Sequence, residues 1–187
     1  KISPNLNLLA NGITSDLNVN YGIQINITAY ETNNGDSDVV YGLYRNNVLV
    51  GGGDTADIAL LAAGSYNYIY NSTEGQNYSS ASLTRTVTVN KTIPNLHLYL
   101  DNLEGNLSAA YGNITNITGI SDEGLVLKLI KNGAEIGNGT LLNEFSSLVA
   151  GNYTYMLLFE GNENYSASNV SYSLEIQKAT PTLSLKL

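Results

Sequence analysis

Asparagine is the residue type in this sequence with the clearest chemical potential. The triplet Asn-x-Ser/Thr, in which x is not proline, is the acceptor signal for N-linked glycosylation. It occurs eleven times in 187 residues, whereas a random order of the same residues would give about four or five. The density predicts a heavily N-glycosylated, secreted surface protein, although turns also favour asparagine for unrelated reasons. The acceptors are Asn26, Asn71, Asn77, Asn90, Asn106, Asn113, Asn116, Asn138, Asn152, Asn164 and Asn169.

Carboxylates form the second group of side chains with chemical potential, because paired acids can bind calcium or hydrolyse glycosides. None of the acidic pairs in this sequence has the regularly spaced acids of a strong calcium loop. We therefore predict solvated loops, no catalytic residues and no cofactor, with calcium binding as the weaker alternative. The pairs lie in three predicted loops, which carry Asp36 and Asp38, Asp54 and Asp57, and Asp122 and Glu123.

The single histidine, His97, is the remaining candidate for acid–base catalysis. A nucleophilic serine or threonine would need such a base positioned beside it. His97 alternates with Leu96 and Leu98, and in a strand this pattern turns it to the face opposite the two leucines. We therefore predict that His97 is a structural surface residue and that the protein is not an enzyme.

Composition excludes several classes of partner. Acidic residues outnumber basic residues sixteen to eight, whereas binding to nucleic acid needs clustered Lys and Arg. The chain has no cysteine, so disulfides and thiolate metal sites are excluded. No apolar run approaches the roughly 20 residues of a membrane helix. We expect neither nucleic-acid binding nor membrane insertion in this segment.

One segment recurs three times and divides the chain into domains. Its copies have the form Lys-x-x-Pro-x-Leu-x-Leu and begin at Lys1, Lys91 and Lys178. The lysines are 90 and 87 residues apart, which is the size of a single domain. The sequence therefore predicts two repeats and a surplus first or donor strand, at residues 1–90, 91–178 and 179–187.

Apolar and polar residues alternate in both repeats, and Gly and Asn turns interrupt the alternation about every 8–12 residues. Aligning the repeats places Leu8, Ile27, Leu43, Leu98 and Leu129 inward. It places Asn26 and Asn116 outward, where a glycan can be carried. Ile23 is also predicted inward, but it aligns with the polar Asn113, so the second copy needs a later strand start or a bulge. The pattern predicts an all-β fold with two tandem β-sandwiches of six or seven strands each.

Tight hairpin turns are predicted at Asn46-Asn47 and at Asn132-Gly133. Both pairs of residues tolerate the positive φ that two-residue hairpin turns require. The turns fall at equivalent places in the two repeats. This agreement supports the alignment.

A glycine precedes an inward tyrosine by two residues in each repeat, at Gly64 and Tyr66 and at Gly151 and Tyr153. This resembles the tyrosine corner of immunoglobulin-like sandwiches, in which the phenol bonds nearby backbone. Both repeats have Leu-x-Ala-Gly-x-Tyr-x-Tyr, then Glu-Gly followed closely by Asn-Tyr, then Lys-x-x-Pro-x-Leu-x-Leu. In this order the motifs resemble the tandem immunoglobulin-like repeats of bacterial and archaeal surface proteins.

The resemblance implies a structural stalk, adhesin or filament component, extracellular and at the cell surface. With dense acceptors, no cysteine and few basic residues, an archaeal surface is the expected setting. The expected partners are other copies of the chain or further immunoglobulin-like repeats. The alternative is an adhesin or carbohydrate-binding module that binds a glycan or surface ligand through the loops at residues 33–38 and 101–106.

The surplus strand carries Leu183, Leu185 and Leu187. Burying three leucine side chains contributes roughly 5–9 kcal/mol, so we expect them to be covered. Either the chain continues into a third domain, or the strand completes a sandwich in a neighbouring subunit. The sequence leaves both alternatives open.

Overall fold

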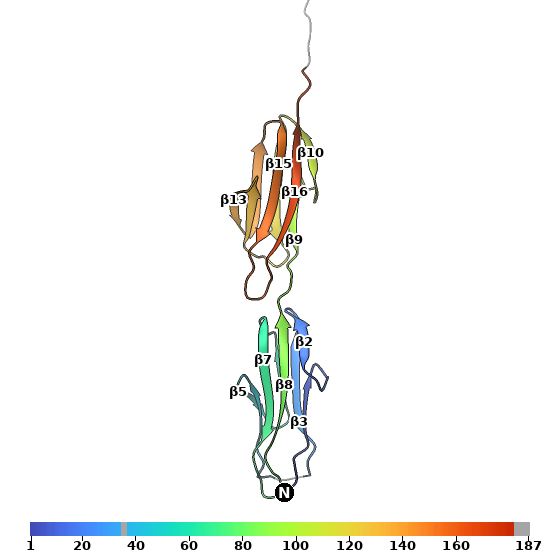
Figure 1. The fold of residues 1–187 in the computed structure, drawn as a ribbon, viewed down its shortest axis with the longest axis vertical. Helices are drawn as coiled ribbons and strands as arrows, with labels where there is room; N and C mark the ends of the chain where they lie inside the picture. The colour runs from blue at the N-terminus through green and yellow to red at the C-terminus, as the bar shows by residue number, and fades with distance from the viewer. Residues whose placement is uncertain (35–36, 182–187) are drawn as a thin grey trace, which may run out of the picture. The chain divides into compact units, whose positions relative to one another are not determined.

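The regular elements of this protein are all β-strands in the computed structural model, which describes residues 1–34 and 37–181 (Figure 1). The chain divides into two compact units, Lys1–Thr92 and Ile93–Leu187, which we call the first and the second sandwich. Each unit contains one three-stranded and one five-stranded sheet. The predicted all-β fold with two tandem sandwiches is confirmed. The described residues contain no helix long and apolar enough to cross a membrane.

The first sandwich has eight strands among its described residues, one or two more than predicted. Its three-stranded sheet has the order β1-β3-β6, and its five-stranded sheet has the order β2-β8-β7-β4-β5. The strands are β1 (Leu6–Ala10), β2 (Leu17–Asn20), β3 (Ile25–Glu31), β4 (Tyr41–Arg45), β5 (Val48–Gly52), β6 (Thr55–Ala59), β7 (Gly64–Ser72) and β8 (Ala81–Asn90).

The second sandwich repeats this topology strand for strand within the described residues. The corresponding sheet orders are β9-β11-β14 and β10-β16-β15-β12-β13. Its strands are β9 (Leu96–Leu100), β10 (Leu107–Ala110), β11 (Ile114–Ser121), β12 (Leu127–Lys131), β13 (Ala134–Gly139), β14 (Leu141–Ser147), β15 (Gly151–Phe159) and β16 (Ser168–Gln177).

The first part of each repeat contributes a strand to both sheets. β1 pairs antiparallel with β3, and β2 then pairs parallel with β8. β9 and β10 repeat these pairings with β11 and β16. A turn with positive φ separates the strands in each case, at Asn11 and Gly12 (47° and 82°) and at Asp101 and Asn102 (49° and 66°). The first part of each repeat therefore runs from one sheet to the other.

The core of each sandwich consists of the apolar side chains that alternation had placed inward. Leu8, Ile27 and Leu43 are almost completely buried in the first sandwich, as are Leu98 and Leu129 in the second. These inward assignments are confirmed. Tyr68, Tyr70 and Tyr155 are also fully buried, so large aromatic rings fill much of the space between the sheets.

The inward assignment of Ile23 is wrong, because its side chain is 51% exposed. β3 begins only at Ile25, and Gly22 with φ of 100° forms the turn before it. The aligned Asn113 is likewise exposed and precedes β11. Both positions therefore lie in a turn, and the conflict in the alignment needs no bulge.

Both predicted hairpin turns are confirmed. Asn46 and Asn47 have φ of 48° and 65°, and Asn132 and Gly133 have φ of 49° and 83°. Each first asparagine also accepts a hydrogen bond at Oδ1 from a backbone N–H of the neighbouring strand, at 2.9 Å in the first sandwich and 2.8 Å in the second. The side chain therefore fixes the turn as well as permitting it.

The predicted surplus strand lies largely outside the described residues. Leu183, Leu185 and Leu187 all fall within residues 182–187, which the structure does not describe. The assignment of residues 179–187 therefore stays a prediction.

Candidate glycosylation sites and polar clusters

All eleven acceptor asparagines lie at the surface, and none is buried. Eight are exposed, and Asn71, Asn116 and Asn164 are half-buried. A bulky, solvated glycan can be carried only at such positions. The acceptors lie on both sheets of both sandwiches, for example Asn26 in β3 and Asn90 in β8. Their occupancy stays a prediction.

Two acceptors occupy the central strand of a three-stranded sheet, Asn26 in β3 and Asn116 in β11. Strand periodicity places each on the same outer face as its hydroxyl residue two positions later. Thr28 Oγ1 donates to Asn26 Oδ1 at 3.4 Å. Thr118 Oγ1 donates instead across the sheet to Asn143 Oδ1 at 3.0 Å. The asparagine and the threonine of each acceptor triplet therefore lie on the same outer face of the sheet.

In each sandwich, a tyrosine forms a hydrogen bond with the backbone just before the strand β7 or β15. Tyr66 Oη donates to the carbonyl oxygen of Ala62 at 2.9 Å. Tyr153 Oη donates to the carbonyl oxygen of Val149 at 3.0 Å. Each bond spans four residues and holds the chain where it enters β7 or β15. These bonds resemble those of a tyrosine corner.

A cation, a carboxylate and a tyrosine meet at the edge of the first core. Asp57 Oδ2 accepts from Arg45 Nη1 at 2.9 Å and from Tyr68 Oη at 2.8 Å. Burial, and then the hydrogen bond to Asp57, raise the pKa of the Tyr68 phenol far above its ordinary value, so Tyr68 remains a donor. The sequence analysis placed Asp57 in a solvated loop, which is wrong. It lies in β6, and its side chain is only 15% exposed.

The second sandwich has a related cluster with different chemistry. Lys131 Nζ contacts Glu144 Oε1 at 3.0 Å, and Ser146 Oγ donates to the same oxygen at 2.5 Å. Burial by itself would raise the pKa of Glu144, but the bonds from Ser146 and Lys131 outweigh it and lower that pKa. Tyr155 Oη is buried and has no hydrogen-bond partner among the described residues.

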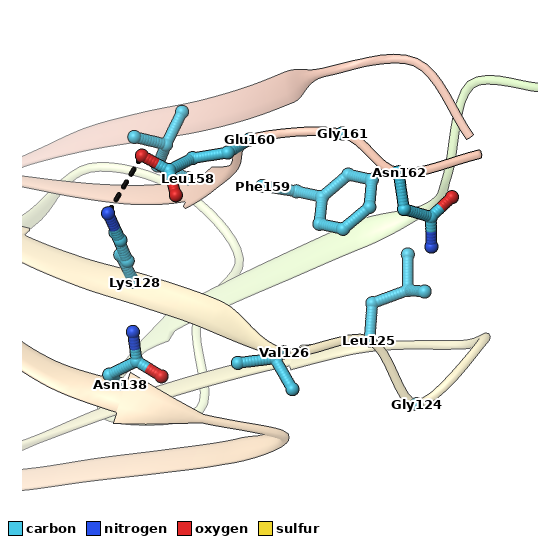
Figure 2. A pocket seen from close by; sticks show the side chains of 10 residues that line it. All are labelled: Gly124, Leu125, Val126, Lys128, Asn138, Leu158, Phe159, Glu160, Gly161 and Asn162. Carbon is cyan, nitrogen blue, oxygen red and sulfur yellow. Dashed lines mark hydrogen bonds and ion pairs between the residues drawn. The ribbon is translucent and has the colours of Figure 1, made fainter. Parts of the chain in front are cut away.

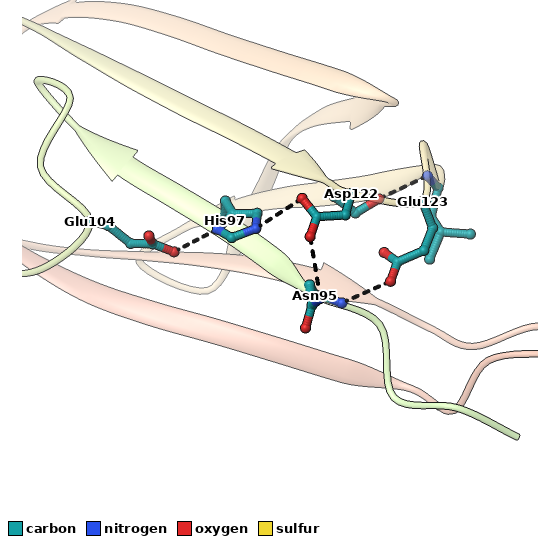
Figure 3. Close-up of polar contacts among 7 residues, drawn as sticks. Asn95, His97, Glu104, Asp122 and Glu123 are labelled. Carbon is teal, nitrogen blue, oxygen red and sulfur yellow. Dashed lines mark hydrogen bonds and ion pairs between the residues drawn. The ribbon is translucent and has the colours of Figure 1, made fainter. Parts of the chain in front are cut away.

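His97 lies between two carboxylates on the outer face of β9 (Figure 3). Its Nδ1 is 2.9 Å from Glu104 Oε1, and its Nε2 is 3.2 Å from Asp122 Oδ1. The Glu104 hydrogen bond, followed by the charges of Glu104 and Asp122, raises the pKa of the His97 imidazole. The side chain is 30% exposed, and its ring stacks on Tyr99 with centroids 6.1 Å apart.

The carboxylates around His97 also hold the start of β9. Asn95 Nδ2 donates to Asp122 Oδ2 at 3.2 Å, and the Asn95 backbone N–H donates to Glu123 Oε1 at 3.2 Å (Figure 3). Asp122 and Glu123, predicted as a solvated pair, are therefore engaged with neighbouring segments. Among the described residues, no group of three or more His, Asp or Glu side chains is arranged to hold a metal ion.

The second sandwich also has a surface pocket of about 450 Å³ between β12 and the turn after β15 (Figure 2). Leu125, Val126 and Phe159 contribute its apolar lining. Lys128 Nζ contacts Glu160 Oε1 across one side at 2.7 Å. The volume is within the range of small-ligand sites. The pocket therefore combines an apolar surface with one fixed ion pair.

We compared the chain with known protein families, curated proteins and solved structures. No protein-family profile matches the chain, and no curated protein matches it. Titin domains Z1Z2 in complex with telethonin are 14% identical, with a TM-score of 0.50, covering 96% of this chain and 100% of that chain. The chain is a tandem of immunoglobulin-like sandwiches.

Two further solved structures are similar to this immunoglobulin-like tandem. Fibronectin(III)-like modules of CbhA from Clostridium thermocellum are 15% identical, with a TM-score of 0.37, covering 96% of this chain and 99% of that one. The tandem immunoglobulin repeats of Dlar are 14% identical, with a TM-score of 0.34, covering 96% and 100%. At these identities the likeness describes the fold alone.

The polar clusters around Asp57, Glu144 and His97 in this immunoglobulin-like tandem were not predicted from the sequence. Glu104 lies 7 residues after His97 and Asp122 lies further along the chain, and no local pattern connects either of them with His97. The ion pairs of Arg45 and Lys131 are reflected in the alignment of the two repeats. A basic residue precedes both hairpin turns, Arg45 and Lys131, and an acidic residue follows 12 or 13 positions later. Shared spacing of opposite charges could have identified these pairs.

Proposed function

We propose that this chain is a structural extracellular protein whose N-glycosylated immunoglobulin-like repeats build a cell-surface filament or stalk. The supporting observation is the placement of all eleven acceptor asparagines at the surface, on both sheets of both sandwiches. Glycans at these positions would cover sheet faces and protect strand edges from wrong pairing. The combination of dense acceptors, no cysteine and few basic residues favours an archaeal surface.

Intact mass spectrometry of the native protein, before and after chemical deglycosylation, tests this proposal. We expect a native mass above the 20.0 kDa of the polypeptide, with the excess removed by deglycosylation. Glycopeptide mapping then assigns the excess to individual asparagines. A native mass equal to that of the polypeptide contradicts the proposal.

Assembly in this proposal is in series or by β-strand donation between subunits. Residues 179–187 repeat the first-strand motif, and in both sandwiches that motif forms a buried strand, β1 or β9. A further copy therefore suits a following domain or the open edge of a neighbouring sandwich. Negative-stain microscopy of full-length protein and of a deletion of residues 179–187 separates the two. Polymerisation that survives the deletion rules out strand donation.

The pocket beside Lys128 favours a second candidate function, binding of a carbohydrate or another surface ligand. Its apolar lining and single ion pair suit a small polar molecule with one apolar face. Of the two loops predicted for ligand binding, 33–38 is only partly described. Loop 101–106 is held by Asp101 Oδ1, which accepts from the Asn116 N–H at 2.6 Å. A glycan array at millimolar calcium tests this candidate, with Val126→Glu as the variant expected to lose binding.

A further inference from the structure

The central strand of the three-stranded sheet carries the same pair of residues in both sandwiches. In the first, Asn26 of β3 lies directly opposite Ile58 of the edge strand β6. In the second, Asn116 of β11 lies directly opposite Phe145 of the edge strand β14. Each acceptor asparagine therefore has a large apolar side chain as its cross-strand neighbour.

These apolar neighbours are uncovered. Ile58 is 58% exposed and Phe145 is 70% exposed. Neither side chain packs in the core of its sandwich, because alternation turns both to the outer face of the sheet. Exposed apolar side chains on an edge strand favour unwanted pairing with other chains. Something that covers Phe145 would remove this liability.

Strand register places the side chain of Asn116 beside that of Phe145. Residues directly opposite in an antiparallel pair have Cβ atoms about 4.5–5.5 Å apart. Asn116 Oδ1 is buried and has no hydrogen-bond partner among the described residues. Asn116 as a whole is half-buried, and Nδ2 is the atom that carries a glycan. A sugar attached there begins beside the aromatic ring.

The other acceptors in paired strands have different neighbours. Asn138 is opposite Lys128, and Asn152 is opposite Glu175. Lys128 and Glu175 are charged and prefer water to the face of a sugar. Asn169 is opposite Leu158, which is apolar but only partly exposed. The pairing of an acceptor with an exposed large apolar residue thus distinguishes Asn26 and Asn116 among the strand acceptors that the structure describes.

We propose that the first sugar of the Asn116 glycan packs against the ring of Phe145, and that the Asn26 glycan packs on Ile58 in the same way. The C–H groups of a hexose face carry partial positive charge and are attracted to the negative face of an aromatic ring. Packing also removes apolar area from water. The inference rests on the proposed function, because it requires glycosylation at these positions.

A double-mutant cycle tests the contact at Asn116. The full chain, Asn116→Gln, Phe145→Ala and the double variant are expressed in cells that N-glycosylate, and glycopeptide mapping reports occupancy. Hydrogen exchange of β15 amides follows unfolding of the second sandwich. With the glycan present, Phe145→Ala raises the unfolding equilibrium constant about fivefold. In the Asn116→Gln background it changes the constant by less than about twofold.

Leu141→Ala is the matched control. Leu141 is also exposed on β14, but it lies opposite Ile120 rather than an acceptor. Its effect should be the same with and without the Asn116 glycan. A cycle of Asn26→Gln and Ile58→Ala should show coupling of the same sign and smaller size, because isoleucine has no ring.

Proton NMR gives a second readout that does not depend on stability. A sugar above an aromatic ring shows upfield-shifted C–H resonances, and Phe145→Ala should abolish the shift. Occupied Asn116 with neither coupling nor ring-current shift overturns this inference and leaves the glycosylated-stalk proposal standing. An Asn116 that is never occupied overturns the inference, and absence of glycans at every acceptor overturns the proposed function as well.

Discussion

The two sandwiches hold the start of their first strand with equivalent hydrogen bonds but with different side chains. In the first sandwich, the Asn5 backbone N–H donates to Asn33 Oδ1 at 2.6 Å, and the Asn5 side chain donates to Thr32. All of these partners are neutral. The neighbouring outward residue of β1, Asn7, is neutral too. The described hydrogen-bond partners of Asn5 in the first sandwich therefore include no carboxylate and no imidazole.

The second sandwich uses carboxylates at the same places. Asn95 bonds to Asp122 and Glu123, and His97 in place of Asn7 lies between Asp122 and Glu104. The backbone geometry needs only acceptors, and either neutral or charged side chains supply them. The comparison shows that one scaffold can hold a neutral or a charged cluster at the same location.

The cation–carboxylate–tyrosine clusters differ in a second way. Tyr68 donates to Asp57, whereas Tyr155 is buried without a hydrogen-bond partner among the described residues. The ion pair is kept in both sandwiches, with Arg45 replaced by Lys131. The Tyr155 hydroxyl still helps to lower the pKa of Glu144, but among the described residues only the first sandwich has a direct tyrosine–carboxylate hydrogen bond of ordinary length.

The largest effects should be equal in the two sandwiches, because their cores are equivalent. Leu8→Ala and Leu98→Ala each remove a fully buried leucine and should each lower the free energy of unfolding by about 2–5 kcal/mol. Differential scanning calorimetry of the whole chain measures both. A difference of more than about 2 kcal/mol between the variants would break the equivalence of the cores.

Removing the carboxylate should cost more in the first sandwich. Asp57→Ala leaves Arg45 and Tyr68 without their shared acceptor, which should cost about 2–3 kcal/mol. Glu144→Ala should cost about 1–2 kcal/mol, because the flexible Lys131 side chain can turn its ammonium group to water. Denaturant unfolding measures the two changes. Equal losses would show that the tyrosine bond adds nothing.

Removing the tyrosine hydroxyl isolates that bond. Tyr68→Phe should lower the free energy of unfolding by about 1.5 kcal/mol, because its hydroxyl donates to a charged acceptor. Tyr155→Phe should cost clearly less than this, because the Tyr155 hydroxyl makes no hydrogen bond of ordinary geometry and only assists in lowering the pKa of Glu144. Each variant is the control for the other when both are measured in one unfolding assay. A loss at Tyr155 as large as that at Tyr68 would contradict the difference.

The smallest effect is a pH dependence confined to the second sandwich. The pKa of His97 is raised in the folded state, so the folded sandwich binds the proton more tightly than the unfolded chain. The added stability is fully present below about pH 6.5, the ordinary pKa of histidine, and is lost as pH rises through the folded pKa. We expect about 0.5–1 kcal/mol for this partly exposed pair.

His97→Asn, which introduces the residue of the first sandwich, should abolish this dependence between about pH 5.5 and 8. Asn7→His is the matched control. It should add no comparable pH dependence, because Thr32 and Thr14 stand where the second sandwich has Asp122 and Glu104. Thermal unfolding at a series of pH values measures both. A wild-type second sandwich that is equally stable across this range would contradict the role of the cluster.

Local pattern was enough to predict much of the fold. Alternation placed Leu8, Ile27 and Leu98 inward, because a strand turns successive side chains to opposite faces. Asn46 and Asn132 indicated hairpin turns, because few other residues accept positive φ. The same periodicity placed Asn26 and Asn116 on the outer face. These features depend on neighbouring residues only, and a single sequence contains that information.

Tertiary structure decided which distant residues meet. Asp57 was assigned to a loop, and only the pairing of β6 with β3 places it in a strand beside Arg45. Ile58 and Phe145 lie opposite acceptor asparagines because of strand register, which depends on how two segments about 30 residues apart are aligned. His97 likewise meets Asp122 through the pairing of β9 with β11. The sequence by itself determined the strands, the turns and the outward acceptors. Register and packing decided which side chains these residues contact, because long-range pairing is not a property of any local pattern.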